Sequence, residues 1–276
     1  TLGGTAVTST AAELNINDGG TSATSTTVVD ADRLILNDNG TMVQVAVTDL
    51  STYIDSKGHL NSVTENSQTG WRFSTATAAN YGDIGTEAVD MSYSASSSST
   101  RGATGDYSTA MGNATTASGN YSTAMGNATT ASGEGSTSRG LSTTASGEGS
   151  TAIGKSTTAS GHSSTATGYS TTASGTNSTT MGYSTTASGS NSIAMGRSTT
   201  ASGSYSTATG RSTTASGSYS TSMGQNTIAS DYGSLVMGKY NSVGSSVTSG
   251  SSATDFDTDN SAFVIGNGTE CGSESD

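Results

Sequence analysis

The sequence predicts an all-β fold, a parallel β-roll built from coils of 14 residues. Three observations predict it. A single register runs from Tyr107 to Ser246, where ten consecutive blocks of 14 residues align without a gap. Each block holds two short stretches of alternating residues, and each stretch ends at a glycine, which is the pattern of strand, turn, strand and turn. The third observation is a composition dominated by small residues.

The composition excludes a conventional globular core. The 276 residues include 37 Gly, no Pro and 105 Ser or Thr, and hydrophobic residues make up 30%. So few large side chains cannot offset the conformational entropy lost when this many residues fold. Composition alone is typical of a disordered chain, but the regular repeat indicates order. Helix is disfavoured because no period near 3.6 residues is present.

The narrow coil constrains its interior. We number block positions from Tyr107 (position one) to Asn120 (position fourteen). Since a 14-residue coil encloses little space, we expect positions two, four and eleven to point inward. In the first block these are Ser108, Ala110 and Ala117. Coils of this kind stack about 4.8 Å apart.

Positions three and five then point outward, because side chains alternate along a strand. Position five carries an apolar residue in most blocks, and we call this set the apolar stripe: Met111, Met125, Ile153, Met181, Met195, Met223 and Met237. A repeated apolar stripe outside a solenoid is most simply explained by association along its length, closed by cyclic symmetry. The alternative, Met packed inside the roll, is disfavoured because Met would not fit.

The blocks Ser-Thr-Ala-Met-Gly (108–112), Ser-Thr-Ala-Ile-Gly (150–154) and Ser-Ile-Ala-Met-Gly (192–196) are each followed by Ala-Ser-Gly. This pattern, over about half the chain, resembles the head repeats of trimeric autotransporter adhesins of the YadA type. The resemblance implies a left-handed parallel β-roll, a homotrimer joined side by side and an adhesive or fibre role. The family's usual Val at position three is Thr in most blocks, which predicts a more polar inter-chain face. Arg139 stands where Met is expected and is a candidate anion site.

The regions outside the repeat differ in character. We divide the chain into an N-terminal attachment module (1–56), a transition and cap (57–92), the repeats (93–246) and a C-terminal acidic loop with a terminal coil remnant (247–276). The repeat region includes a weaker block that begins at Tyr93, and the remnant spans residues 260–266. Trp71 is expected to pack within the cap.

The N-terminal module is predicted to mix helix and strand. A capping box at residues 10–13 opens a short helix, residues 32–36 and 41–47 form a β-hairpin around a turn at 37–40, and residues 48–54 form a helical turn. Thr-Ala-Ala-Glu-Leu-Asn (10–15) and Ala-Asp-Arg-Leu-Ile-Leu-Asn-Asp-Asn-Gly (31–40) are similar to segments of phage and other viral tail fibres. This resemblance implies a virion fibre.

Charge and hydropathy limit the partners. The net charge is −12, from nine basic and 21 acidic residues, which argues against nucleic acid. From Tyr107 to Ser246, however, five basic residues outnumber three acidic ones, so the acidity belongs to the two ends. There is no apolar run near 18 residues, so we expect no membrane span.

The sequence offers little for catalysis. With a single Cys, Cys271, and two histidines, His59 and His162, no arrangement of nucleophile, base and orienting group can be nominated, and we expect no enzyme. No cofactor is expected apart from a candidate calcium site at Asp255, Asp257 and Asp259. This segment departs from the calcium-loop pattern, so a solvated acidic loop is the alternative.

Tyrosines mark candidate recognition sites at the turns. Tyr121, Tyr169, Tyr183, Tyr205 and Tyr219 are candidate receptor or glycan contacts, because an exposed Tyr offers both an apolar ring and a hydroxyl. The alternative is that they serve spacing and solubility.

Three functions follow from these observations. The first is a homotrimeric structural and adhesive fibre on a virion surface, joined to other virion or surface-fibre proteins and presenting a surface to a host glycan or protein receptor. The alternative is an extracellular adhesin of the trimeric autotransporter type on a bacterial cell surface. The second alternative is an ice-binding β-solenoid that uses outward Thr and Ser ladders at positions ten and twelve, for example Thr116 and Ser118.

Overall fold

The computed structural model describes residues 29, 32–38, 41–55, 60–241 and 263–267. Contacts between Cα atoms divide the chain into two units, Thr1–Ser56 and Lys57–Asp276. In the first unit, β1 (Arg33–Asp38) and β2 (Thr41–Ala46) form an antiparallel hairpin, and α2 (Val47–Asp55) follows. The predicted hairpin and helical turn are confirmed. The short helix predicted at residues 10–13 lies outside the described residues.

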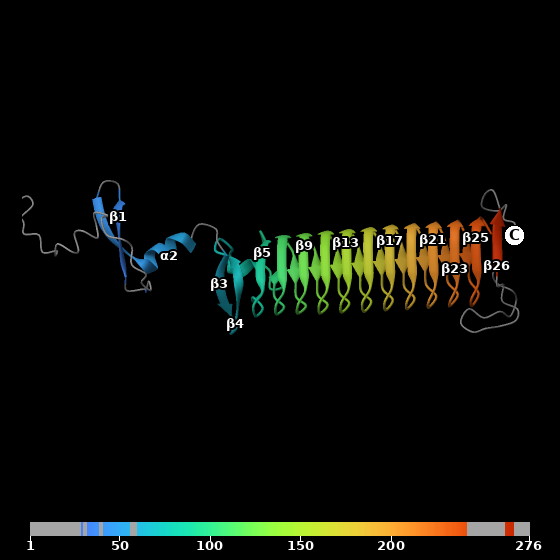
Figure 1. Cartoon of the computed structure of the whole chain (residues 1–276), viewed down its shortest axis with the longest axis horizontal. Coiled ribbons are helices and arrows are strands. Elements are labelled where there is room, and N and C mark those ends of the chain that lie inside the picture. Colours follow the sequence, from blue (N-terminus) through green and yellow to red (C-terminus); the bar gives the residue numbers. More distant parts are fainter. Residues whose placement is uncertain (1–28, 30–31, 39–40, 56–59, 242–262, 268–276) are drawn as a thin grey trace, which may run out of the picture. The chain divides into compact units, whose positions relative to one another are not determined.

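The second unit is a parallel β-solenoid with two sheets (Figure 1). Each coil contributes a five-residue strand to one sheet and a two-residue strand to the other. The long strands are β5 (Val89–Tyr93), β7 (Thr109–Asn113), β9 (Thr123–Asn127), β11 (Thr137–Leu141), β13 (Thr151–Lys155), β15 (Thr165–Tyr169), β17 (Thr179–Tyr183), β19 (Ile193–Arg197), β21 (Thr207–Arg211), β23 (Thr221–Gln225) and β25 (Leu235–Lys239). The short strands are β6 (Gly102–Ala103), β8 (Thr116–Ala117), β10 (Thr130–Ala131), β12 (Thr144–Ala145), β14 (Thr158–Ala159), β16 (Thr172–Ala173), β18 (Thr186–Ala187), β20 (Thr200–Ala201), β22 (Thr214–Ala215) and β24 (Ile228–Ala229).

Backbone geometry at three positions of each coil fixes the turns. Positions one and eight take positive φ angles, for example 59° at Tyr121 and 52° at Ala128. Position six is always glycine from β7 to β25, and at Gly126 the φ angle is 134°. A Cβ added there would collide with the backbone of Gly140 in the next coil. Glycine is therefore required at position six for coils to stack at hydrogen-bonding distance, whereas positions one and eight accept side chains.

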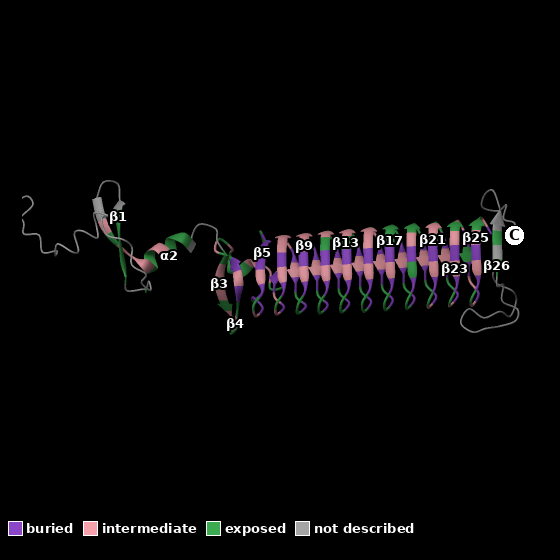
Figure 2. Ribbon diagram, in the orientation of Figure 1, coloured by how far each residue is buried: buried purple, intermediate pink, exposed green. Residues whose placement is uncertain are grey.

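The interior of the solenoid is filled by small side chains, and Figure 2 shows buried residues recurring from coil to coil. The predicted inward positions are confirmed, since Ser108, Ala110 and Ala117 are at most 1% exposed. Position nine also points inward: Thr115 and its equivalents up to Thr227 are fully buried. This position lies two residues before position eleven, so strand alternation places both on one face. The core therefore consists of Ser, Ala, Thr and Ala in most coils.

The register at the start of the repeat differs from the prediction. Tyr93 pairs with Asn113, so it occupies position seven, and its predicted alignment with Tyr107 at position one is wrong. Residues 94–101 form a longer turn, which places Met91 and its partner Met111 20 residues apart in the sequence. From Ala103 onward the 14-residue register holds, because Ala103 pairs with Ala117.

The N-terminal end of the long-strand sheet closes with an antiparallel hairpin of β3 (Leu60–Glu65) and β4 (Gln68–Phe73), and β4 runs parallel to β5. A 3-10 turn, η1 (Ala78–Asn80), follows the hairpin. The half-buried Trp71 lies in β4 opposite Val89. At the other end, β26 (Phe263–Asn267) pairs with β25 in the repeat's register, which confirms the coil remnant.

A buried charged network holds the hairpin to the first coil. Asp90 occupies position four, where most coils carry Ala, and is fully buried. Arg72, 3% exposed, donates from Nε to Asp90 Oδ2 at 3.1 Å and from Nη1 to Glu65 Oε1 at 2.9 Å. It also donates from Nη2 to the carbonyl oxygen of Gly82 at 2.9 Å and lies over the ring of Tyr81 at 4.9 Å. The ion pair therefore satisfies a charge that replaces the small core residue at this end.

Candidate interaction surfaces

The outer face of the long-strand sheet presents positions three, five and seven. The structure places all seven residues of the apolar stripe on this face, in strands that pair in direct register, as Met111 does with Met125 and Met181 with Met195. The side chains are half-buried or exposed in the single chain, and Met181 is 48% exposed. Thr167 and Thr209 also take position five, so polar residues interrupt the stripe.

The stripe extends beyond both predicted ends. Met91 in β5 lies opposite Met111, and Ile265 in β26 lies opposite Met237 and is 54% exposed. Sequence reasoning missed Met91 because Asp90 and Ser92 stand where the motif has Ala and Gly. Ile265 belonged to the recognised remnant, but residues 242–262 separate it from the repeat.

Arg139 lies on the same face, between Met125 and Ile153 in neighbouring strands. It is exposed, and no carboxylate among the described residues lies within ion-pair distance of it. Its interpretation as an anion site stays a prediction.

The candidate tyrosines fall on two different edges of the solenoid. Tyr121, Tyr205 and Tyr219 occupy position one; Tyr121 stacks on Tyr107 at 5.2 Å and Tyr205 on Tyr219 at 4.9 Å between ring centroids. Tyr169 and Tyr183 occupy position seven, at the ends of β15 and β17, and stack at 5.0 Å. All five are exposed, between 41% and 61%. The structure therefore does not gather them into one site.

The short-strand sheet carries the Thr and Ser ladders. Position-ten threonines lie in direct register, as Thr116 does with Thr130 and Thr144 with Thr158, and they are half-buried. The position-twelve serines beside them, such as Ser118, are exposed.

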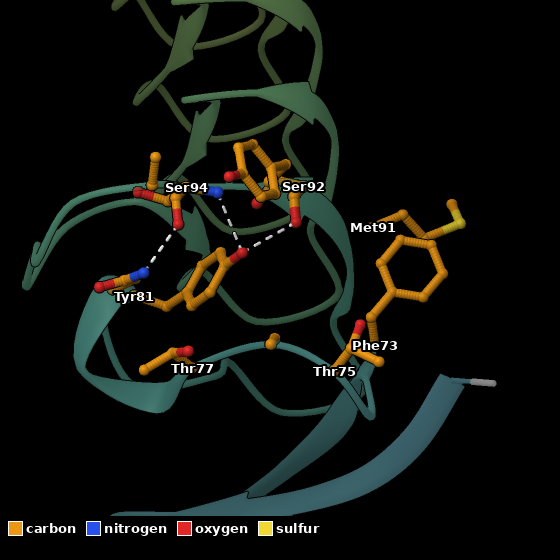
Figure 3. Close-up of a pocket in the computed structure, with 11 residues that line it drawn as sticks. Phe73, Thr75, Thr77, Tyr81, Met91, Ser92 and Ser94 are labelled. Carbon is orange, nitrogen blue, oxygen red and sulfur yellow. Dashed lines mark hydrogen bonds between the residues drawn. The ribbon is translucent and has the colours of Figure 1, made fainter. Parts of the chain in front are cut away.

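A pocket of about 360 Å³ opens at the N-terminal end of the solenoid (Figure 3). Phe73 and Met91 contribute apolar groups to its lining, and Tyr81, Ser92 and Ser94 contribute polar ones. The Tyr81 hydroxyl donates to the Ser92 carbonyl oxygen at 3.1 Å and accepts from the Ser94 amide at 3.0 Å. These bonds brace the wall of the pocket.

The described residues offer no metal centre. They contain no group of three or more His, Cys, Asp or Glu residues that could hold a metal ion. His162 is exposed, with Nε2 at 3.7 Å from Glu148 Oε1 and Nδ1 at 3.1 Å from Ser163 Oγ. The candidate calcium residues Asp255, Asp257 and Asp259 lie outside the described residues, as do His59 and Cys271. No described helix has the length and apolar character needed to span a membrane.

Comparison with protein families identifies the coils. The family model described as the YadA head domain repeat (2 copies) matches residues 103–129, 117–138, 131–157, 159–185, 187–213 and 215–241. The matched segments follow one another along the solenoid from β6 to the end of the described repeat, and they confirm the resemblance seen in the sequence. No curated protein matches the chain significantly.

Proposed function

We propose, from the premise that the chain belongs to the YadA head-repeat family through residues 103–241, that this protein is a trimeric surface adhesin. In this proposal three solenoids associate side by side and project a non-catalytic binding surface from a cell. The family match supports the cell-surface adhesin. It does not support the virion fibre expected from residues 10–15 and 31–40.

The apolar stripe is the observation that carries the proposal. It runs along a sheet face whose opposite side already packs the narrow interior, and no other described element covers it, so we infer that another chain does. Each half-exposed Met or Ile that becomes fully buried contributes roughly 1 kcal/mol. Summed over the coils of three chains, that gain supports a stable assembly.

Polar residues also line the proposed interface between the three chains, which we call the seam. Position three is Thr in most coils and half-buried in the single chain. The apolar exceptions are Val89, Ile193, Leu235 and Phe263. If the seam lies close to a three-fold axis, three copies of Arg139 come near one another. Such a cluster is stabilised by an anion or by side chains that turn their guanidinium groups outward.

The proposal is tested by introducing charge into the stripe. Beads coated with the Met181→Glu/Met195→Glu variant are expected to lose attachment to cell monolayers under flow, together with the trimeric mass. The matched control is Ser188→Glu/Ser202→Glu, which adds the same charges in the same two coils at exposed position-twelve sites on the other sheet. Attachment that survives in the stripe variant, or is absent from wild type, contradicts the proposal.

A second candidate function rests on the Thr and Ser ladders. The register of the short-strand sheet repeats Thr at every coil over eight coils, from Thr116 to Thr214. Such a regular array supports an ice-binding surface. Thermal hysteresis in solution is the expected signal, and freezing behaviour identical to that of a non-binding control protein removes this candidate.

A further inference from the structure

The ten repeat blocks separate their charges onto different parts of the coil. All five basic residues lie on the outer face of the long-strand sheet: Arg139 at position five, and Lys155, Arg197, Arg211 and Lys239 at position seven. The three acidic residues Glu134, Glu148 and Asp231 lie at positions thirteen and fourteen, in the turns that precede the long strands. Position seven ends the long strand, so the acidic residues lie near the start of the long strands and the position-seven cations lie at their ends.

The position-seven residues from Lys155 to Lys239 form a continuous column, which we call the basic edge. Its members pair in direct register from coil to coil: Lys155, Tyr169, Tyr183, Arg197, Arg211, Gln225 and Lys239. All except Gln225 are exposed. At about 4.8 Å per coil the column is roughly 29 Å long.

The two tyrosines of the basic edge have both outer ring faces covered. The rings of Tyr169 and Tyr183 are nearly parallel, at 3°, with centroids 5.0 Å apart. Lys155 Nζ lies 5.4 Å from the centroid of Tyr169, and Arg197 Cζ lies 5.7 Å from that of Tyr183. The rings therefore have no free face for a nucleobase or a sugar ring. The groups left for recognition are the cations and the phenol hydroxyls.

The cations of the basic edge are available for a ligand. Among the described residues, no carboxylate lies within ion-pair distance of Lys155, Arg197, Arg211 or Lys239. Arginine binds planar anions through two parallel hydrogen bonds, and lysine provides a point charge. The four cations are spread along the column, with Arg197 and Arg211 in neighbouring coils. Such a spread fits a polymer with repeated anionic groups better than a single small anion.

We propose that the basic edge binds a linear anionic polysaccharide, carrying sulfate or carboxylate groups, laid along the axis of the coils. Single-stranded nucleic acid is the competing polyanion, but proteins bind it by stacking bases on aromatic rings, and here the ring faces are covered. The inference rests on the proposed adhesive function, because it names the class of ligand. If three chains join through the apolar stripe, burying this row of unpaired cations would be costly. Each fibre then carries three basic edges, and their simultaneous engagement strengthens attachment.

Binding of the full chain to immobilised heparin, a sulfated polysaccharide probe, tests the inference. We expect binding at an ionic strength of about 0.15 M that weakens as salt is raised, and weaker binding to neutral dextran. Arg197→Gln/Arg211→Gln is expected to reduce heparin affinity about tenfold, on the basis of two exposed ion pairs of up to about 1 kcal/mol each. Arg33→Gln, which removes the same type of charge from the first unit, is expected to change it less than about twofold.

The mass of each variant separates this inference from the proposed function. The double variant lies outside the stripe and is expected to keep the assembly of wild type. Heparin binding that persists while cells are not bound supports the basic edge and contradicts the adhesin. The inference is overturned by absent heparin binding, by equal heparin affinity in the double variant, or by tighter binding of single-stranded DNA that depends on the basic edge.

Discussion

Replacing Gly154 by Ala tests whether close coil stacking holds the solenoid together. Gly154 has a φ angle of 131°, and an added Cβ would collide with the backbone of Gly168 in the next coil. Alanine at this φ costs about 1–3 kcal/mol in backbone strain. Relief of the collision moves β13, which contains Gly154, away from β15 and weakens hydrogen bonds of about 1 kcal/mol each. We expect a loss of at least about 3 kcal/mol, or a melting midpoint roughly 6–12 °C lower.

Gly149 in the same coil provides the matched control. Its φ angle is 61°, and an added Cβ meets only Ser163 Oγ at 3.5 Å, an ordinary contact. The equivalent position holds Tyr121 at 59° and Asn177 at 53°. Gly149→Ala is therefore expected to cost at most about 1 kcal/mol. Thermal melting followed by circular dichroism measures both variants, and equal midpoints would refute the reasoning about position six.

Other substitutions test the core, the cap and the seam. Thr157→Val is expected to raise the free energy of unfolding by about 1 kcal/mol, because the buried Thr157 hydroxyl has no hydrogen-bond partner among the described residues. Thr143→Val is expected to lower the free energy of unfolding by about 1 kcal/mol, because Thr143 Oγ1 lies 2.7 Å from Ser138 Oγ and that hydrogen bond would be lost. Asp90→Asn is expected to cost about 3–5 kcal/mol by breaking the buried ion pair of the cap, with hydrogen exchange accelerating first in β3 to β5. Met195→Glu is expected to dissociate the assembly in light scattering while the circular dichroism spectrum stays that of β structure.

Each of these expectations has a contrary outcome. Matched effects of the two Thr→Val changes would show that the hydroxyl pairing does not decide core stability. Unchanged hydrogen exchange in β3 to β5 of the Asp90→Asn variant would show that the ion pair does not stabilise the cap. An unaltered mass for Met195→Glu would place the seam elsewhere.

The repeat was predictable because its constraints recur in every coil. Position-six glycine and the small residues at positions two, four and eleven each report a local steric limit, and ten copies make the register unambiguous. Thr115 and its equivalents at position nine were missed as core residues. Thr is common both in interiors and on surfaces, so its residue type does not indicate burial. The two-residue spacing from Thr115 to Ala117 is the signal that places both side chains on the same face of the strand.

The irregular segments were not predictable from the sequence for a different reason. The longer turn at residues 94–101 preserves a 14-residue spacing between Tyr93 and Tyr107 while the coil itself is longer, so an identical residue type at the expected spacing predicted the wrong position. The network joining Arg72, Asp90 and Glu65 has no repeated spacing and depends on how β3 and β4 fold back on the first coil.

Which tyrosine rings stack on one another also depends on the path of the coil. Tyr169 and Tyr183 differ from Tyr205 and Tyr219 by block position, and that difference places them on opposite edges. The block position in the sequence distinguishes the two pairs of tyrosines, whereas the residue type alone does not.

The mass of the full chain in solution decides whether separate solenoids associate through the apolar stripe. Native mass spectrometry or light scattering is expected to give three times the 27.1 kDa chain mass, with conversion to single chains only on unfolding. A folded β-rich species at 27.1 kDa, stable on dilution with its stripe in water, would contradict the account.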